Sequence, residues 1–92
     1  MILLDTNVLS ELMRAKPDPA VVAWIDAQPA QDLLISSITV AEILYGIARM
    51  PKGKRRQALQ DLAIAMFEED FAGRILPFDA DAAVHYAELA AE

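Results

Sequence analysis

The chain has 92 residues, a formal net charge of −6 at pH 7, 55% apolar residues and no cysteine. The absence of cysteine excludes disulfide bonds and thiolate metal sites and favours a reducing, cytoplasmic location. The net negative charge argues against a protein that binds nucleic acid through its overall charge. No apolar run reaches the length of a membrane span or of a signal-peptide core, so a soluble protein without a membrane partner is expected.

The size of the chain predicts a single small domain over residues 1–92 with a modest core. An apolar fraction of 55% is high for so short a chain, which indicates that part of the apolar surface meets a partner chain. We therefore expect oligomerisation.

The first predicted element is a buried strand at residues 2–5 that ends in an acid, Asp5. A short apolar run of this kind suits a parallel sheet, and the spacing of the apolar residues that follow predicts a helix over residues 7–14. In open α/β sheets the ligand crevice lies at the carboxyl ends of the strands, so Asp5 is a candidate to bind a metal ion or attack a phosphate. The alternative is that Asp5, Thr6 or Asn7 only caps the helix.

The next elements predicted are a helix that begins at Pro19, a buried strand over residues 33–36 and a helix from residue 37 to about residue 50. Trp24 lies on the apolar face of the first of these helices, and we expect it in the core. Together with the first strand and helix, this order indicates an alternating α/β protein with a parallel sheet.

Glu42 is the second candidate acid, because it lies one turn into the helix that follows the second strand. If the two strands are parallel neighbours, Glu42 and Asp5 approach one crevice, as a hard cation with oxygen ligands would require. The alternative is a capping box over Thr39-Val40-Ala41-Glu42, in which Glu42 bonds only to its own helix.

Basic residues gather at the connection to the next helix, which is predicted over residues 54–72. Five of the eight basic residues lie there: Arg49, Lys52, Lys54, Arg55 and Arg56. Such a patch could contact RNA phosphates, and the alternative is a solvated turn between two helices. The helix itself should bury a stripe formed by Ala58, Leu59, Leu62, Ala63, Met66 and Phe67.

The last predicted elements are a short strand over residues 74–78 and a helix that Asp79 caps and that continues to residue 92. His85 in this helix is expected at the surface or in packing rather than as a ligand. Because the helical pattern runs to the last residue without a closing strand, we expect a domain that is incomplete at its C-terminus.

Three segments that contain these residues together resemble the PIN domain, and more narrowly the VapC and FitB-like toxins of bacterial toxin–antitoxin pairs. They read Leu3-Leu4-Asp5-Thr6-Asn7-Val8-Leu9, Ile35-Ser36-Ser37-Ile38-Thr39-Val40-Ala41-Glu42-Ile43-Leu44-Tyr45-Gly46 and Leu76-Pro77-Phe78-Asp79. The resemblance runs from Met1 to Glu92. It implies a three-layer α/β/α fold with a parallel sheet whose C-terminal strands are missing here.

The resemblance also implies a function. Asp5 and Glu42 match acids that bind Mg²⁺ or Mn²⁺ in a ribonuclease site, and Thr6 and Asn7 match their polar neighbours. It further implies an RNA substrate, a cognate antitoxin and a homodimer. Members of the family carry one or two more catalytic acids in a segment beyond the last helix, and no residue here corresponds to them. Asp79 lies before that segment, so we do not assign it as a metal ligand.

Two alternatives from other classes follow from the same residues. In the first, the chain is a truncated, non-catalytic remnant that binds an antitoxin or another partner chain through apolar grooves. In the second, Asp5 is the nucleophile of a phosphotransferase or phosphatase and forms an aspartyl-phosphate. Asn7 argues against the second alternative, because haloacid-dehalogenase-like enzymes usually place another acid at that position.

Overall fold

The computed structural model describes the backbone of residues 1–91, and the side chains of all of these except residues 82, 85, 86 and 89–91. Two predictions therefore lie outside the described residues: the setting of the His85 side chain and the continuation of the last helix to residue 92. Among the described residues, no helix combines the length and the apolar character that crossing a membrane would require.

A parallel sheet organises the fold. Its strands are β1 (Ile2–Leu3), β2 (Leu33–Ser36) and β3 (Ile75–Leu76), in the order β1-β2-β3. Ile2 lies opposite Leu33, and Ile35 lies opposite Ile75. Pairing continues one residue beyond β1, where the Leu4 amide donates to the Leu34 carbonyl at 2.8 Å. The central strand is therefore covered on both edges.

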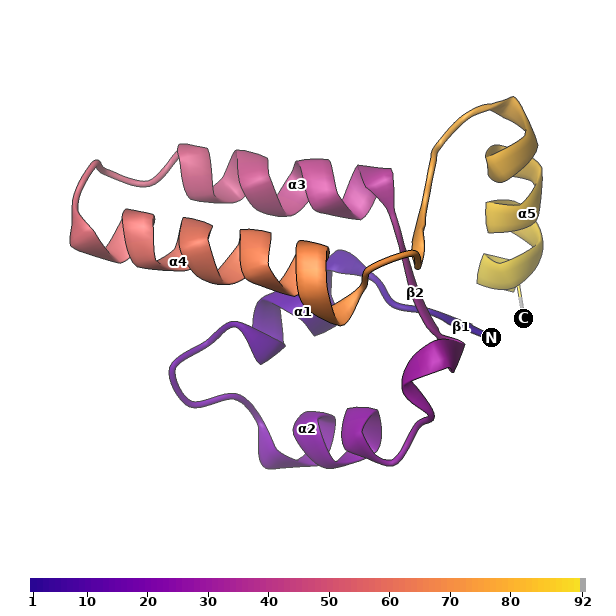
Figure 1. Ribbon diagram of the computed structural model, residues 1–92, viewed down its shortest axis with the longest axis horizontal. Helices are drawn as coiled ribbons and strands as arrows, with labels where there is room; N and C mark the ends of the chain where they lie inside the picture. The colour runs from indigo at the N-terminus through magenta and orange to yellow at the C-terminus, as the bar shows by residue number, and fades with distance from the viewer. Residues whose placement is uncertain (92) are drawn as a thin grey trace.

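Helices alternate with the strands as predicted, which confirms the α/β class and the three-layer arrangement. They are α1 (Thr6–Leu12), α2 (Pro19–Asp26), α3 (Ser37–Ala48), α4 (Lys54–Ala65) and α5 (Ala80–Ala91), with a short 3₁₀ helix at Ala30–Asp32 and a π-helix at Met66–Asp70. Figure 1 shows α3 and α4 side by side, with α5 on the opposite side of the strands. The fold thus places α1, α3 and α4 together on one side.

Polar side chains begin three of the helices by accepting hydrogen bonds from amides that the helix leaves unpaired. Asp5 caps α1 through Val8 N at 2.9 Å, and Ser36 caps α3 through Thr39 N at 3.2 Å. Asp18 caps α2, in which Pro19 occupies the first turn. Two of these caps, Asp5 and Ser36, lie at the carboxyl ends of neighbouring strands.

One predicted helix, residues 54–72, is divided in two by the structure. The regular α4 ends at Ala65, and the Phe71 amide bonds the Met66 carbonyl at 3.1 Å, which is the i→i+5 pattern of a π-turn. Met66, Phe67 and Phe71 are all buried in the core. The helix therefore ends in a turn whose three apolar side chains pack into the core.

The strand β3 is held against β2 through Arg74. Its guanidinium donates to the carbonyls of Leu33 and Asp70 and lies 5.4 Å from the centre of the Phe71 ring. The preceding residue, Gly73, has a φ of 74°, a conformation that side chains with a Cβ adopt only at a cost. The tight turn before β3 therefore depends on both residues.

The expectation that Trp24 lies in the core is wrong. Trp24 is 47% exposed, and none of the side chains of α2 is buried. The helix contacts α1 and lies at the margin of the described fold (Figure 1). Its apolar face therefore remains partly open to solvent.

The core centres on Leu9 and Ile35, both 0% exposed. We predict that Ile35→Val lowers the free energy of unfolding by about 0.5–1.5 kcal/mol, because it removes a buried methylene and leaves a small cavity. Urea unfolding followed by circular dichroism measures the change. The matched control is Ile64→Val at a position 38% exposed, which should change the free energy of unfolding much less; equal effects of the two variants would contradict this account of the core.

Candidate active site

The two candidate acids lie at the same edge of the sheet. Asp5 follows β1 by two residues, and Glu42 lies in the first half of α3, which begins directly after β2. Because β1 and β2 are parallel neighbours, their carboxyl ends meet at one edge. Both acids are exposed to solvent. The predicted approach of two separate strand–helix junctions is therefore present.

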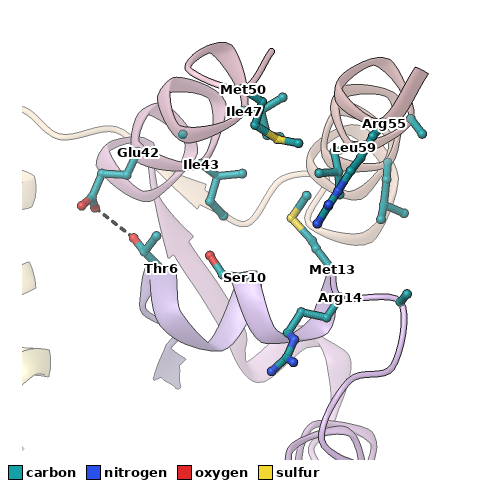
Figure 2. A pocket seen from close by; sticks show the side chains of 14 residues that line it. Thr6, Ser10, Met13, Arg14, Glu42, Ile43, Ile47, Met50, Arg55 and Leu59 are labelled. Atoms are coloured by element: carbon teal, nitrogen blue, oxygen red, sulfur yellow. Dashed lines mark hydrogen bonds between the residues drawn. The ribbon is translucent and has the colours of Figure 1, made fainter. Parts of the chain in front are cut away.

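A hydrogen bond joins the two junctions. Thr6 Oγ1 donates to Glu42 Oε1 at 2.9 Å, across 36 positions in the sequence (Figure 2). Thr6 is the first residue of α1 and directly follows Asp5. The contact therefore holds the Glu42 carboxylate beside the start of α1.

Glu42 does not serve as a capping residue. The helix α3 begins at Ser37 and its N-cap is Ser36, so Thr39 lies inside the helix and is buried. The capping-box alternative for Thr39 to Glu42 is therefore wrong. The carboxylate of Glu42 reaches another helix instead of its own backbone.

Asp5 has the capping role that was one of the two alternatives for it. Its Oδ1 accepts the Val8 amide at 2.9 Å and so caps α1. No described residue donates a hydrogen bond to Asp5 Oδ2 or to Glu42 Oε2. The cap therefore fixes the Asp5 carboxylate at the end of its strand while one oxygen stays open to a ligand.

Asn7 stands apart from this contact. Its side chain is exposed in the first turn of α1 and makes no hydrogen bond to a described residue. The structure thus brings Thr6, but not Asn7, into contact with one of the two acids.

The donor set fits a hard divalent cation. Carboxylate oxygens are the ligands that Mg²⁺ prefers, and Mg²⁺ is commonly bound by one or two carboxylates, with water and substrate phosphate completing its shell. The described residues contain no group of three or more His, Cys, Asp or Glu placed around one metal position. Asp5 and Glu42 are therefore the residues that would hold such an ion.

A groove of about 550 Å³ extends from the Thr6–Glu42 contact between α1, α3 and α4. Apolar side chains form most of its walls: Met13, Ile43, Ile47, Met50, Leu59 and Leu62. Arg14 and Arg55 lie at the end opposite Glu42 and Thr6 (Figure 2). Arg14 also pairs with Glu11, with 3.1 Å between nitrogen and oxygen. The groove therefore has an acidic end, an apolar middle and a basic end.

The stripe that was predicted to be buried on a helix over residues 54–72 is buried only in part. Leu62 is 48% exposed and Ala58 is exposed, and both line the groove. Ala63, Met66 and Phe67 are buried as predicted. The apolar stripe therefore divides between the core and an open surface.

The five clustered basic residues have different surroundings. Arg49 lies with its guanidinium 5.7 Å from the centre of the Tyr45 ring, and Arg55 lines the groove. Arg56 is half-buried and donates to the Met50 carbonyl at 3.5 Å, which gives it a structural role. Lys52 and Lys54 are exposed. The stretch is therefore not one uniform patch.

Sequence reasoning missed the residues of α1 that continue from Thr6 into the groove. Ser10, Met13 and Arg14 line it along with Thr6. Their positions four, seven and eight residues after Thr6 are those of one helix face. That spacing was the signal that could have identified them.

Comparison with known proteins shows the family of the chain. The PIN domain family model matches residues 2–92. The chain is 54% identical over 92 residues to the VapC ribonuclease Y4jK of Sinorhizobium fredii, 46% identical over 89 residues to the toxin FitB of Neisseria gonorrhoeae, and 49% identical over 92 residues to the plasmid stability protein StbB of Pseudomonas syringae pv. tomato. These matches cover 100%, 97% and 100% of the chain, which spans 66%, 64% and 66% of the relatives' lengths.

Solved structures give the same result. The crystal structure of FitAcB from Neisseria gonorrhoeae matches with a TM-score of 0.81 and 46% sequence identity, over 96% of this chain and 63% of that one. The structure of FitAB bound to an IR36 DNA fragment matches with the same TM-score and identity, over 96% of this chain and 62% of that one. From the family model and these relatives together, the chain belongs to the PIN domain family.

Proposed function

We propose that the chain carries part of the active site of a toxin ribonuclease, in which Asp5 and Glu42 bind Mg²⁺ or Mn²⁺ for hydrolysis of RNA phosphodiester bonds. The observation that carries the proposal is the hydrogen bond from Thr6 to Glu42, because it joins the two strand–helix junctions that bear the acids. The names of the relatives, a VapC ribonuclease and a toxin, support the same activity.

Each residue of the site has a separate task in this proposal. Asp5 presents a carboxylate that the start of α1 holds in place, and Glu42 presents a second one that Thr6 orients. A divalent cation, when bound, would stabilise negative charge on the phosphate and acidify a water molecule. The open position of both acids leaves room for an RNA backbone.

Partners form a second part of the proposal. We infer a cognate antitoxin, since one relative is named as the toxin FitB, and a homodimer in the cytoplasm. The apolar groove supports the antitoxin, because a helix or extended segment seated in it would lie against Glu42 at one end and Arg14 and Arg55 at the other. Such a partner would block access to Glu42.

A non-catalytic role is the second candidate. It is favoured by one observation: among the described residues only two acids meet at the site, with no third acid or histidine beside them. In this case the chain binds the antitoxin through the groove without cleaving RNA. Membership of the PIN family argues against the aspartyl-phosphate alternative.

The acids are tested by RNA cleavage and by metal binding in parallel. We expect Mg²⁺-dependent cleavage of a structured RNA, lost with EDTA and in Asp5→Asn, and loss of Mn²⁺ binding by calorimetry in the same variant. Asparagine is as good a helix cap as aspartate, so the fold should persist. The control is Glu68→Gln, an exposed acid of the π-helix. Cleavage that survives in EDTA or in Asp5→Asn contradicts the metal site. A folded chain that binds antitoxin but never cleaves RNA supports the second candidate.

Thr6 is tested by its own pair of variants. We expect Thr6→Val to weaken Mn²⁺ binding about 10–100-fold, the usual cost of removing a hydrogen bond that orients a metal-binding side chain. Thr6→Ser keeps the hydroxyl and should restore the affinity. If valine and serine variants bind Mn²⁺ equally, Thr6 does not position Glu42.

A further inference from the structure

The exposed face of α3 carries a row of one acidic, one aromatic and one basic side chain. Glu42, Tyr45 and Arg49 follow one another at intervals of three and four residues, so they lie on one side of the helix. All three are exposed, and Tyr45 is 64% exposed. The row begins at the candidate acid and ends where the basic connection to α4 starts.

We propose that Tyr45 and Arg49 bind single-stranded RNA beside the cleavage site, with the Tyr45 ring stacked on an unpaired base and Arg49 on a neighbouring phosphate. The proposal rests on the ribonuclease function proposed above and adds two residues, beside the acids, that position the RNA strand. Recognition of single-stranded RNA commonly combines aromatic stacking with contacts from arginine.

The spacing of the row suits a nucleotide chain. With a rise of about 1.5 Å per residue, Tyr45 lies roughly 4.5 Å and Arg49 roughly 10.5 Å beyond Glu42 along the helix axis. Stacked nucleotides advance by about 3.4 Å each along a strand. A strand whose phosphate reaches Glu42 therefore places its next two or three nucleotides over Tyr45 and Arg49.

The contact between Tyr45 and Arg49 prepares this surface. The guanidinium carbon of Arg49 lies 5.7 Å from the centre of the Tyr45 ring, within the range of a cation–π interaction. The contact orients two long side chains before any ligand arrives and puts a positive charge over one face of the ring. Single exposed aromatics are common on proteins, and Trp24 on α2 is one of them; Tyr45 differs because it lies between an acid and a cation.

Gly46 lies on α3 between the row and the groove. It lies inside α3, one turn after Glu42, although glycine destabilises a helix interior relative to alanine. Packing within the chain does not require it, because a Cβ added there would meet no atom within 4 Å. Because Gly46 also lines the groove, a bare backbone at this position lets a ligand approach α3 closely where the groove borders the row.

Charge favours RNA over a protein partner as the occupant. The chain has a net charge of −6, so it can hold RNA only where cations gather locally. Arg49 and the exposed Lys52 continue the row in that direction. The test below distinguishes RNA binding at this face from a protein interface at the same face.

The test measures binding of a fluorescein-labelled, single-stranded oligoribonucleotide by anisotropy in EDTA, where no cleavage occurs. We expect Tyr45→Ala to weaken binding roughly 5- to 150-fold, the usual effect of removing one stacking platform, and Tyr45→Phe to retain it. Arg49→Gln should weaken binding and reduce the slope of log affinity against log salt by about one. A duplex RNA of the same sequence should show no dependence on Tyr45.

Trp24→Ala, which alters an exposed aromatic on α2, is the matched control and should leave binding unchanged; circular dichroism checks that each variant is folded. Binding that persists in both Tyr45→Ala and Arg49→Gln overturns the proposal, and so does a change of oligomeric state in sedimentation with unchanged RNA binding. If the native chain does not bind RNA, the ribonuclease function is contradicted as well. If only the two variants lose RNA binding while they still bind Mn²⁺, the result supports the proposal.

Discussion

The parallel pairing of β1 with β2 is the constraint on which the site depends. Leu3 lies opposite Leu34, and the Leu4 amide extends the pairing to the residue before Asp5. Two strands that run in the same direction deliver their carboxyl ends to one edge, whereas an antiparallel pair would place them at opposite ends. Without this pairing, Asp5 and Glu42 would not belong to one site.

Asp5 shows how one side chain serves the fold and the site together. Its bond to the Val8 amide satisfies the start of α1 and also sets the direction of the carboxylate. Thr6, the next residue, then reaches Glu42. Because the same turn ends β1, begins α1 and positions both acids, local unfolding of α1 would remove the site as a unit.

The surface around the site divides into two faces of α3. One side of the helix borders the apolar groove through Ile43 and Ile47, and another carries Tyr45 and Arg49. Glu42 lies where these faces meet, so a partner in the groove and an RNA strand along the row would compete at this residue. In the proposed function, the protein partner and the RNA would therefore use different sides of one helix and meet only at Glu42.

The sequence by itself determined the order of strands and helices and the position of Asp5 at a strand end, because apolar period, proline, glycine and caps act locally. Its three motifs also resembled those of the PIN domain family, which the family model then showed. Contacts between distant segments decided the rest. Glu42 fits a capping box in sequence, yet Thr6 from another helix holds it; Trp24 and Leu62 fit apolar stripes, yet both are about half exposed. A periodic pattern shows which side of a helix is apolar, but only the packing of the other elements decides whether that side meets the core, a groove or solvent.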